Sequence, residues 1–263
     1  MARKTKLRSD MGWSTADRIG VRGLDLCDDI IGKLNLGDFA FLEIKGRIPT
    51  EAESVVFNAM LATLVEHGMT PMAIATRLTY LGAPESLQAA VAAGLCGMGT
   101  TFAGTVEGSA RILQDALAKA EPSIDLPQLA KKIVSENVAA KRPIPGIGHP
   151  VHKPIDPRTP RLFAIASANG LSGKYVELMQ LIAAEAERAL NKPGGLPVNA
   201  TGAIGALASE LEIPWRLCRG LAVIGRAIGL VGHISEELQN PIAREIWERV
   251  EEESSAHARP DAA

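Results

Sequence analysis

Aromatic side chains are scarce in this sequence. Of its 263 residues only 4% are Phe, Trp or Tyr, whereas 46% are hydrophobic. The core must therefore be built from Ala, Leu, Ile, Val and Met, and small aliphatic side chains favour closely packed helices. The length allows one large domain or two modest ones. It is sufficient to bury a core without the help of disulfides or metals.

An excess of charge of either sign is missing too. Lys and Arg number 28 and Asp and Glu number 30, which gives a net charge of −2. This balance gives no sign of a nucleic-acid-binding protein, although it is compatible with a local basic pocket for a phosphorylated cofactor. Cysteine is sparse and forms no CxxC pair, so we expect neither a disulfide framework nor a CxxC metal site. A reducing compartment fits the three widely spaced residues Cys27, Cys96 and Cys218.

Long uninterrupted apolar runs are also absent. The segment MARKTKLRSD at the start is basic, but no apolar region follows it, so no signal peptide is expected. The longest apolar stretch, residues 217–234, carries Arg219, Arg226 and His233. A membrane-spanning helix would not tolerate these residues without a reason. We therefore expect a soluble, cytoplasmic protein with neither a membrane nor a nucleic-acid partner.

Helical periodicity dominates the rest of the chain, and no segment shows the sustained alternation of a strand. Thr50 and Glu53 form a capping box that predicts a helix ending near Gly68. Asp125 is placed to cap a later helix, and turns with short helices are expected between residues 17 and 49. The tail SSAHARPDAA is predicted to be disordered. We predict an all-α fold with helices over residues 50–68, 70–80, 85–93, 106–120, 127–140, 160–169, 174–190, 201–211, 215–238 and 243–252.

Residues 141–160, KRPIPGIGHPVHKPIDPRTP, differ from this pattern. Six prolines in twenty residues remove backbone donors and fix φ, so no helix or central strand can run here. The segment also lacks the Gly/Ser repeats of a flexible linker. We therefore predict a rigid loop of the kind that often holds binding groups.

Four histidines are candidates for chemistry. His149 lies in this loop beside glycines that would let a ligand approach the backbone closely. His152 follows three residues later, but no third residue is spaced to complete a metal site with the two, so no metal is expected. His67 follows the helix begun at Thr50, and either a helix-dipole role or a role in a site is open for it. His233, in the apolar helix, is expected to be a satisfied core or interface histidine.

Three arginines add to the histidines. Arg158 ends the proline-rich loop, Arg226 lies in the long apolar helix and Arg244 follows the break at residues 240–241. Each by itself would be an ordinary ion pair, although the cation of Arg226 needs an anionic partner or a ligand in an apolar setting. Together with the histidine loop they indicate recognition of a small di- or tricarboxylate, which guanidinium groups bind in bidentate fashion.

The chain resembles the citrate synthase superfamily over residues 17–247, most closely its short citryl-CoA lyase branch, which is similar to the C-terminal module of ATP-citrate lyase. The resemblance depends on five motifs in the family's order. The loop is the most specific of them. In chain order they are DRIGVRGLDL, GDFAFLEIKGRIPTEAE, EHG at residues 66–68, PGIGHPVHKPIDPR and IGRAIGLVGHISEEL.

This resemblance implies a citrate synthase-like fold, in which a smaller helical domain is inserted into a large helical domain and the site lies in the cleft between them. Here the large domain would comprise residues 1–104 and 204–263, and the small domain residues 105–203. The resemblance also implies a homodimer or higher homo-oligomer. It implies no permanently bound cofactor and a coenzyme A thioester as substrate.

The resemblance also assigns roles to residues. His149 would hydrogen-bond the oxoacid carbonyl, and His67 would contact the same group. Arg158 and Arg226 would bind the substrate carboxylates, and Arg244 corresponds to an arginine contributed across the dimer. The backbone of residues 143–149 would contact coenzyme A, in particular through Pro145, Gly146, Ile147 and Gly148.

Two positions depart from citrate synthase. Where the synthase has a His-Gly-Gly segment, this chain has Phe102 followed by Ala and Gly, as the lyase module does, which favours a lyase. Where the family has a catalytic Asp after an Asn, this chain has Thr201. A threonine hydroxyl is no general base near neutral pH without an activating partner, but it can donate or accept a hydrogen bond.

These observations predict an enzyme that cleaves a carboxylated 3-hydroxyacyl-CoA by a retro-aldol reaction, as citryl-CoA gives acetyl-CoA and oxaloacetate. His149, His67 and Thr201 are its predicted catalytic residues. Because Thr201 replaces the Asp, three alternatives stay open. They are a lyase for a different hydroxyacyl-CoA, a non-catalytic homologue that binds coenzyme A or citrate, and a citrate synthase.

Overall fold

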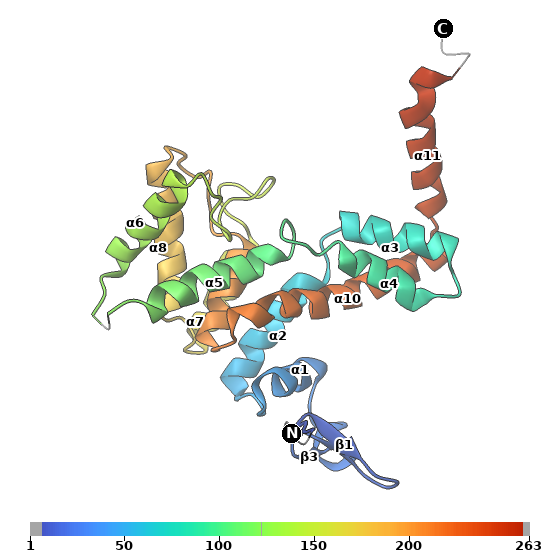
Figure 1. Ribbon diagram of the computed structural model, residues 1–263, viewed down its shortest axis with the longest axis horizontal. Helices are drawn as coiled ribbons and strands as arrows, with labels where there is room; N and C mark the ends of the chain where they lie inside the picture. Colours follow the sequence, from blue (N-terminus) through green and yellow to red (C-terminus); the bar gives the residue numbers. More distant parts are fainter. Residues whose placement is uncertain (1–6, 122, 260–263) are drawn as a thin grey trace, which may run out of the picture.

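The computed structural model describes residues 7–121 and 123–259. These residues form a largely helical protein, as predicted (Figure 1). The helices α1 to α11 span Leu36–Lys45, Glu51–Val65, Pro71–Gly82, Leu87–Cys96, Gly104–Ala118, Leu126–Ala139, Arg158–Ala168, Lys174–Ala189, Ala200–Glu210, Trp215–Gln239 and Ala243–Ser255.

The capping box at the start of α2 is confirmed. The Thr50 hydroxyl accepts a hydrogen bond from the backbone N–H of Glu53, whose carboxylate accepts one from the backbone N–H of Thr50. The helix ends at Val65, three residues before the predicted end at Gly68. Glu66 leaves the helical region with φ −135°, and Gly68 has φ +72°, a left-handed conformation that glycine adopts without strain. His67 therefore lies in a turn after the helix.

The N-terminal region contains strands that the sequence did not predict. A small antiparallel sheet joins β1 (Gly12–Ser14) to β2 (Ile19–Val21), and β2 to β3 (Leu24–Asp25). The Trp13 indole lies so close to Gly20, its partner across the sheet, that a Cβ on Gly20 would come within 2.4 Å of it. Strands of two or three residues are too short for an alternating pattern to be recognised. A π-helical turn, Leu26–Ile30, leads on to α1.

Two smaller expectations were also wrong. Asp125 precedes α6 but makes no side-chain capping bond, since its carboxylate does not reach a free N–H of the first turn. The tail is ordered further than predicted. In it α11 continues to Ser255, and a short 3-10 helix follows over Ala256–Ala258. There the Arg259 guanidinium donates to the Ser255 hydroxyl. Residues 1–6 and 260–263 lie outside the described part of the chain.

The core confirms the expectation of aliphatic packing. Buried Ala, Leu, Ile, Val and Met from α2 and from α5 to α10 form one large cluster. Its paired aromatics are Phe41 and Phe57, whose ring centroids lie 5.3 Å apart in an edge-to-face arrangement. A smaller cluster joins α10 to α3 and α4. Because the large cluster is continuous, residues of both predicted domains share one core.

The predicted domain boundaries fall at different kinds of place. The boundary at 104/105 coincides with the start of α5, whereas the boundary at 203/204 falls inside α9. The division into a large and a small domain therefore stays a prediction, although α5 to α8 do lie together around the N-terminal half of α10 (Figure 1).

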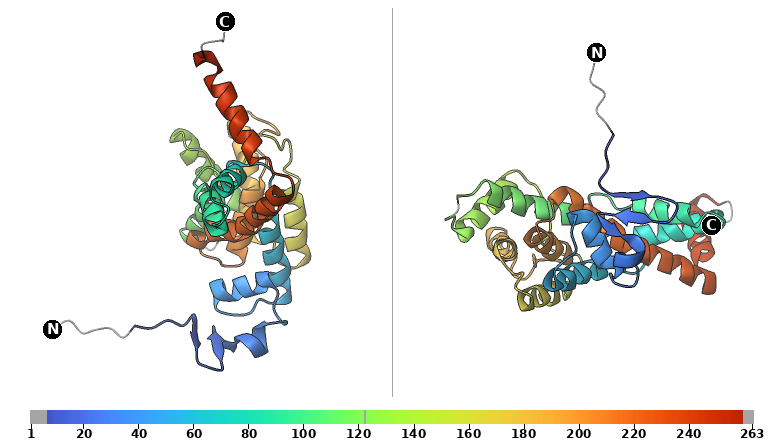
Figure 2. Two further views of the ribbon diagram at one scale, coloured as in Figure 1. Left: turned by 90° about the vertical axis from the view of Figure 1, so that its right-hand side faces the viewer. Right: turned by 90° about the horizontal axis from the view of Figure 1, so that it is seen from below.

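Helix α10 runs through the middle of the molecule (Figure 1). It has 25 residues and is long and apolar enough to cross a membrane. Half of its most apolar stretch, however, is buried against the rest of the protein. A Cβ on Gly229 would lie 2.0 Å from the carbonyl oxygen of Val65, so glycine is required for α10 to pack against the end of α2. We interpret α10 as a core helix. After it, α11 projects away from the body, as Figure 1 and the left view of Figure 2 show.

Candidate functional site

The proline-rich segment forms a loop between α6 and α7 and lies against the start of α9. The backbone N–H of Gly148 donates to the carbonyl of Pro197 at 2.7 Å, and that of Asn199 donates to the carbonyl of Gly146 at 3.0 Å. Helix α7 begins at Arg158, two residues before the predicted position. The loop is thus fixed to a helix that follows it by some fifty residues in the chain.

Two glycines make this contact between the loop and α9 possible. Gly146 has φ +89°, which disfavours residues with a Cβ. A Cβ on Gly202, in the first turn of α9, would lie 2.1 Å from the carbonyl oxygen of Gly146. The two backbones therefore touch directly, and their contact sets Thr201 beside the histidine loop.

The hydroxyl of Thr201 is engaged locally. It donates to the side-chain oxygen of Asn199 at 2.7 Å, and the Asn199 amide nitrogen donates to the carbonyl of Gly148 at 2.7 Å. Asn199 also caps α9 by accepting from the backbone N–H groups of Thr201 and Gly202. Thr201 therefore helps to orient Asn199 against the loop. Its proton is already in use, which agrees with the expectation that it is not a general base.

A carboxylate that sequence reasoning passed over organises the end of the loop. Asp156 is fully buried. It accepts a bidentate pair of hydrogen bonds from Arg158, at 2.9 and 2.7 Å, and one from the backbone N–H of Ala200 at 2.9 Å. Burial by itself would raise the pKa of Asp156, but these hydrogen bonds lower it to about 2. The Asp-Pro-Arg motif was the signal that could have found it.

Three imidazoles meet beside this carboxylate. His149 and His152 stack with ring centroids 4.3 Å apart, and His67 lies edge-on to both at 6.1 Å. His67 comes from the turn between α2 and α3, so the fold joins two distant segments here. The structure thus places the predicted residues His67 and His149 together and adds His152 to them.

The hydrogen bonds of His149 determine where its proton lies. The backbone N–H groups of Val151 and His152 donate to its Nδ1 at 3.1 and 2.9 Å. A nitrogen that accepts hydrogen bonds carries a lone pair, so the neutral ring holds its proton on Nε2. The pKa of His149 is lowered, first by burial and then by the charges of His152 and Arg158. At neutral pH His149 therefore presents an Nε2–H donor.

The pKa of His67 is lowered as well, first by burial and then by the charges of Arg158 and Arg226. Ring nitrogens of the three histidines lie within 4.8 Å of one another, a spacing that a metal ion can bridge. His67 therefore supplies the third possible metal ligand beside His149 and His152, which the spacing of residues in the sequence did not reveal. The Nδ1 of His149 is already occupied, however, and two guanidinium groups lie close by. This environment suits an anion better than a cation, so the absence of a metal remains our prediction.

Arg226 on α10 is the unsatisfied cation of the site. Arg226 is 7% exposed, and its buried Nη1 atom has no hydrogen-bond partner among the described residues. Burial lowers the pKa of Arg226, and the charge of Glu66 opposes this effect. A buried guanidinium without a full set of acceptors costs free energy unless an anion completes it. Arg158, by contrast, already has Asp156 as a partner.

Arg244 is not brought into this cluster within the chain. It is exposed on α11, where it pairs with Glu248 at 3.7 Å and lies over the Trp247 ring at 6.0 Å. Figure 1 shows α11 projecting away from the loops between α6 and α9. Its role across a dimer stays a prediction.

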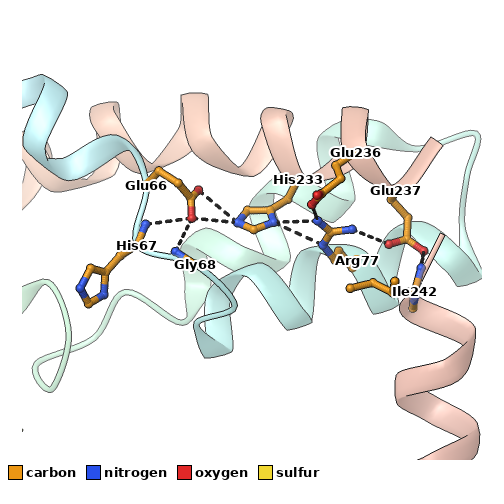
Figure 3. Close-up of polar contacts among 9 residues, drawn as sticks. Glu66, His67, Gly68, Arg77, His233, Glu236, Glu237 and Ile242 are labelled. Carbon is orange, nitrogen blue, oxygen red and sulfur yellow. Dashed lines mark hydrogen bonds and ion pairs between the residues drawn. The ribbon is translucent and has the colours of Figure 1, made fainter. Parts of the chain in front are cut away.

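A chain of polar contacts centred on the buried Arg77 and His233 holds the His67 turn from behind (Figure 3). Arg77 is fully buried and donates to Glu237 at 2.7 Å, to Glu236 and to the Nδ1 of His233. The Nε2 of His233 meets Glu66, and the Glu66 carboxylate accepts from the backbone N–H groups of His67 and Gly68. His233 is therefore a satisfied core histidine, as expected. Figure 3 shows the His67 ring pointing away from this chain of contacts.

A large cavity opens next to the loop. It has a volume of about 1120 Å³, lies between α5 and α6, and reaches Pro143 and Pro145. Its wall carries four basic residues and three acidic ones. Two of the basic residues are paired with acids on their own helices, Arg111 with Asp115 and Lys132 with Glu136. The remaining lining cations are Lys119 and Arg142, which suit phosphate groups.

With this geometry in view, comparison with known proteins identifies the class of the chain. The family model described as "Citrate synthase, C-terminal domain" matches residues 32–247, so the chain belongs to the citrate synthase family. This finding confirms the resemblance inferred from the five motifs.

Within this family, the chain is similar to several individual proteins. The chain is similar to a solved citryl-CoA lyase from Hydrogenobacter thermophilus, with 36% identity and a TM-score of 0.80 over 89% of this chain and 88% of that one. It also shares its fold with ATP citrate lyase from Methanothrix soehngenii, solved with citrate and coenzyme A (24% identity, TM-score 0.73, 91% and 40% covered). A probable ATP-citrate synthase of Dictyostelium discoideum is 28% identical over 242 residues. These amount to 85% of this chain and 37% of that relative's length.

Proposed function

We propose that this protein is a carbon–carbon lyase that cleaves citryl-CoA to acetyl-CoA and oxaloacetate. The observation that carries the proposal is a cluster in which His149, an imidazole N–H donor, lies 6.1 Å from His67. The charge of the buried, unsatisfied guanidinium of Arg226 acts on His67 in turn. A carboxylated acyl group supplies the anion that such a site lacks. The similarity to a citryl-CoA lyase over most of both chains supports it.

The coenzyme A thioester is the substrate, and no permanently bound cofactor or metal is needed. The nucleotide part of coenzyme A occupies the cavity beside Pro143 and Pro145, with its phosphates near Lys119 and Arg142. The backbone of residues 145–148 then faces the thioester arm.

The reaction breaks the bond between the hydroxyl-bearing carbon and the carbon next to the thioester. The hydroxyl loses its proton, its O–H electron pair forms the ketone of oxaloacetate, and the bond's electron pair forms the thioester enolate. The Nε2–H of His149 stabilises charge on the developing ketone oxygen. A preorganised donor of this kind contributes roughly 3–4 kcal/mol to the barrier reduction. Arg226 and the N–H groups of Arg158 that do not bond Asp156 hold the substrate carboxylates.

The positions that differ from citrate synthase support the proposal. The Thr201 hydroxyl, which donates to Asn199, is not the carboxylate that the citrate synthases have at this place. Phe102 occupies the place of the synthase histidine. The same change at Thr201 favours one second candidate, a lyase for a different hydroxyacyl-CoA.

We further propose that the protein is a cytoplasmic homodimer. The projecting helix α11 exposes Trp247 and Val250, which a second copy could cover, and it carries Arg244. The three cysteines are free thiols, which suits a reducing compartment. Mass determination in solution tests the dimer.

Incubation of the purified protein with citryl-CoA, with oxaloacetate measured as it forms, tests the function. We expect the wild type to turn over, and His149→Ala to lower kcat by about 10²–10³. His257→Ala, exposed near the end of α11, is the matched control and leaves the rate unchanged.

The other outcomes discriminate the alternatives. Faster cleavage of another hydroxyacyl-CoA reassigns the substrate, and calorimetric binding of coenzyme A or citrate without any turnover identifies a non-catalytic homologue. Net citrate formation from acetyl-CoA and oxaloacetate identifies a synthase.

A further inference from the structure

The proposed reaction leaves one proton without an evident carrier. A group beside the substrate must take the proton of the hydroxyl when the carbon–carbon bond breaks. His149 does not do so, because its Nδ1 accepts two backbone hydrogen bonds and its Nε2 already holds a proton. Thr201 does not do so either, because its hydroxyl is itself a donor to Asn199.

The two nearby carboxylates are also committed. Asp156 is fully buried and accepts from Arg158 and from the backbone of Ala200, and these contacts stabilise its ionised form as a structural anion. Glu66 accepts from two backbone N–H groups and from His233. A carboxylate that is satisfied in this way is a poor proton acceptor.

Two basic groups remain, the rings of His67 and His152. Neither ring forms a hydrogen bond with another residue in the described part of the chain. His152 lies closer to His149, since the two rings are stacked at 4.3 Å whereas His67 is 6.1 Å from each. The backbone N–H of His152 also holds the Nδ1 of His149, so both rings share one rigid segment. An oxygen bonded to His149 is therefore within easy reach of His152.

We propose that His152 is the acid–base residue of this site and replaces the carboxylate that Thr201 lacks. This inference rests on the proposed function. In the cleavage direction His152 takes the hydroxyl proton while the bond's electron pair moves to the carbon next to the thioester. The imidazolium of His152 then gives a proton to that carbon, which yields the methyl group of acetyl-CoA. Atoms and charge balance without any other reactant, and His152 returns to its neutral form.

The test compares alanine variants of the two free histidines. His152→Ala keeps the backbone N–H that orients His149, so the loop contact survives. We expect its kcat for citryl-CoA to fall by about 10²–10⁴, with KM little changed. Added imidazole should restore a measurable part of the lost rate, because a small base can enter the vacated space. A purely structural role would not give this rescue.

The matched variant is His67→Ala, in which imidazole should restore nothing. Rescue of His67→Ala but not of His152→Ala would assign the proton transfer to His67 and overturn the proposal. An unchanged kcat in His152→Ala would overturn it as well. Lack of turnover by the wild type, by contrast, contradicts the proposed function itself.

Two further variants keep the test decisive if His152→Ala folds poorly. His152→Gln preserves a polar side chain but cannot carry a proton, so its kcat should fall as far. Adding Thr201→Asp to His152→Gln supplies a carboxylate and should recover at least about tenfold of the lost rate. Wild-type activity in His152→Gln would exclude proton transfer by this residue.

Discussion

Two clusters of polar groups meet at residues 66 and 67, and they are built in opposite ways. In the chain of contacts from Arg77 through His233 to Glu66, each group finds a partner within the protein. In the histidine cluster, the Nη1 of Arg226 has no partner within the described residues. The first arrangement stabilises the fold, and the second is complete only with a ligand.

The comparison of the two histidines is instructive. His233 and His149 both accept hydrogen bonds at Nδ1, so both present an Nε2–H. The Nε2 of His233 faces Glu66 at 3.1 Å. That of His149 forms no hydrogen bond with another described residue. Identical tautomers thus serve structure in one place and leave a donor for a substrate in the other.

The substitution with the largest expected effect on this contrast between the two clusters is Arg226→Met. Substrate affinity should fall, with KM for citryl-CoA rising at least about thirtyfold, or roughly 2 kcal/mol. The free energy of unfolding should not fall, because the substitution removes a buried charge that lacks a full set of acceptors. Steady-state kinetics and urea denaturation measure the two effects.

The control for this variant is Arg219→Met, on the same helix. Arg219 already pairs with Glu107 at 2.8 Å and is more exposed, so its loss should leave KM unchanged. A drop in stability together with an unchanged KM in Arg226→Met would show that Arg226 is a structural ion pair.

His233→Leu should give the opposite result, a loss of stability. Arg77 loses an acceptor and Glu66 loses a donor, which costs about 1–3 kcal/mol of unfolding free energy. His233→Gln retains an acceptor for Arg77 and a donor for Glu66, so we expect a smaller loss. Urea titrations compare the variants, and equal losses would mean that the contacts of the ring contribute nothing.

Acid should weaken the contact of the loop with α9 through Asp156. The pKa of Asp156 is about 2 in the folded protein, below the ordinary value of 3.8 for an aspartate side chain, so folding stabilises its ionised form. That stability is present above pH 4 and is lost as the pH falls towards 2, by about 2 kcal/mol. Unfolding free energies of the wild type and Asp156→Asn should converge over this range. In the control Asp115→Asn, an exposed position, the difference from wild type should stay constant.

Local signals in the chain predicted much of the fold. The capping box at Thr50, the helical periodicity and the prolines of the loop each act over a few residues, and each was placed within two or three residues of its observed position. The sheet near Trp13 was missed, because its strands are shorter than any pattern that alternation can reveal. The prediction that Asp125 caps its helix was wrong, because residue type alone does not determine side-chain geometry.

The residues of the candidate site likewise fall into those that a local motif predicted and those that it did not. His149 and Arg158 were found because they share one loop with a specific motif. Asp156 was passed over although it lies in that motif, because its importance comes from the backbone of Ala200, far along the chain. Arg77 was missed since nothing in its surroundings in the sequence shows that it is buried against His233.

The amino-acid sequence by itself determined a helical protein with an aliphatic core, a stiff proline-rich loop and its histidines, because these depend on neighbouring residues and on composition. Only the tertiary structure decided that His67 joins His149 and His152, that Asp156 holds the start of α9, and that Arg226 is left without a full set of acceptors. These features depend on segments brought together from distant parts of the chain, and on which polar groups the packing excludes from water.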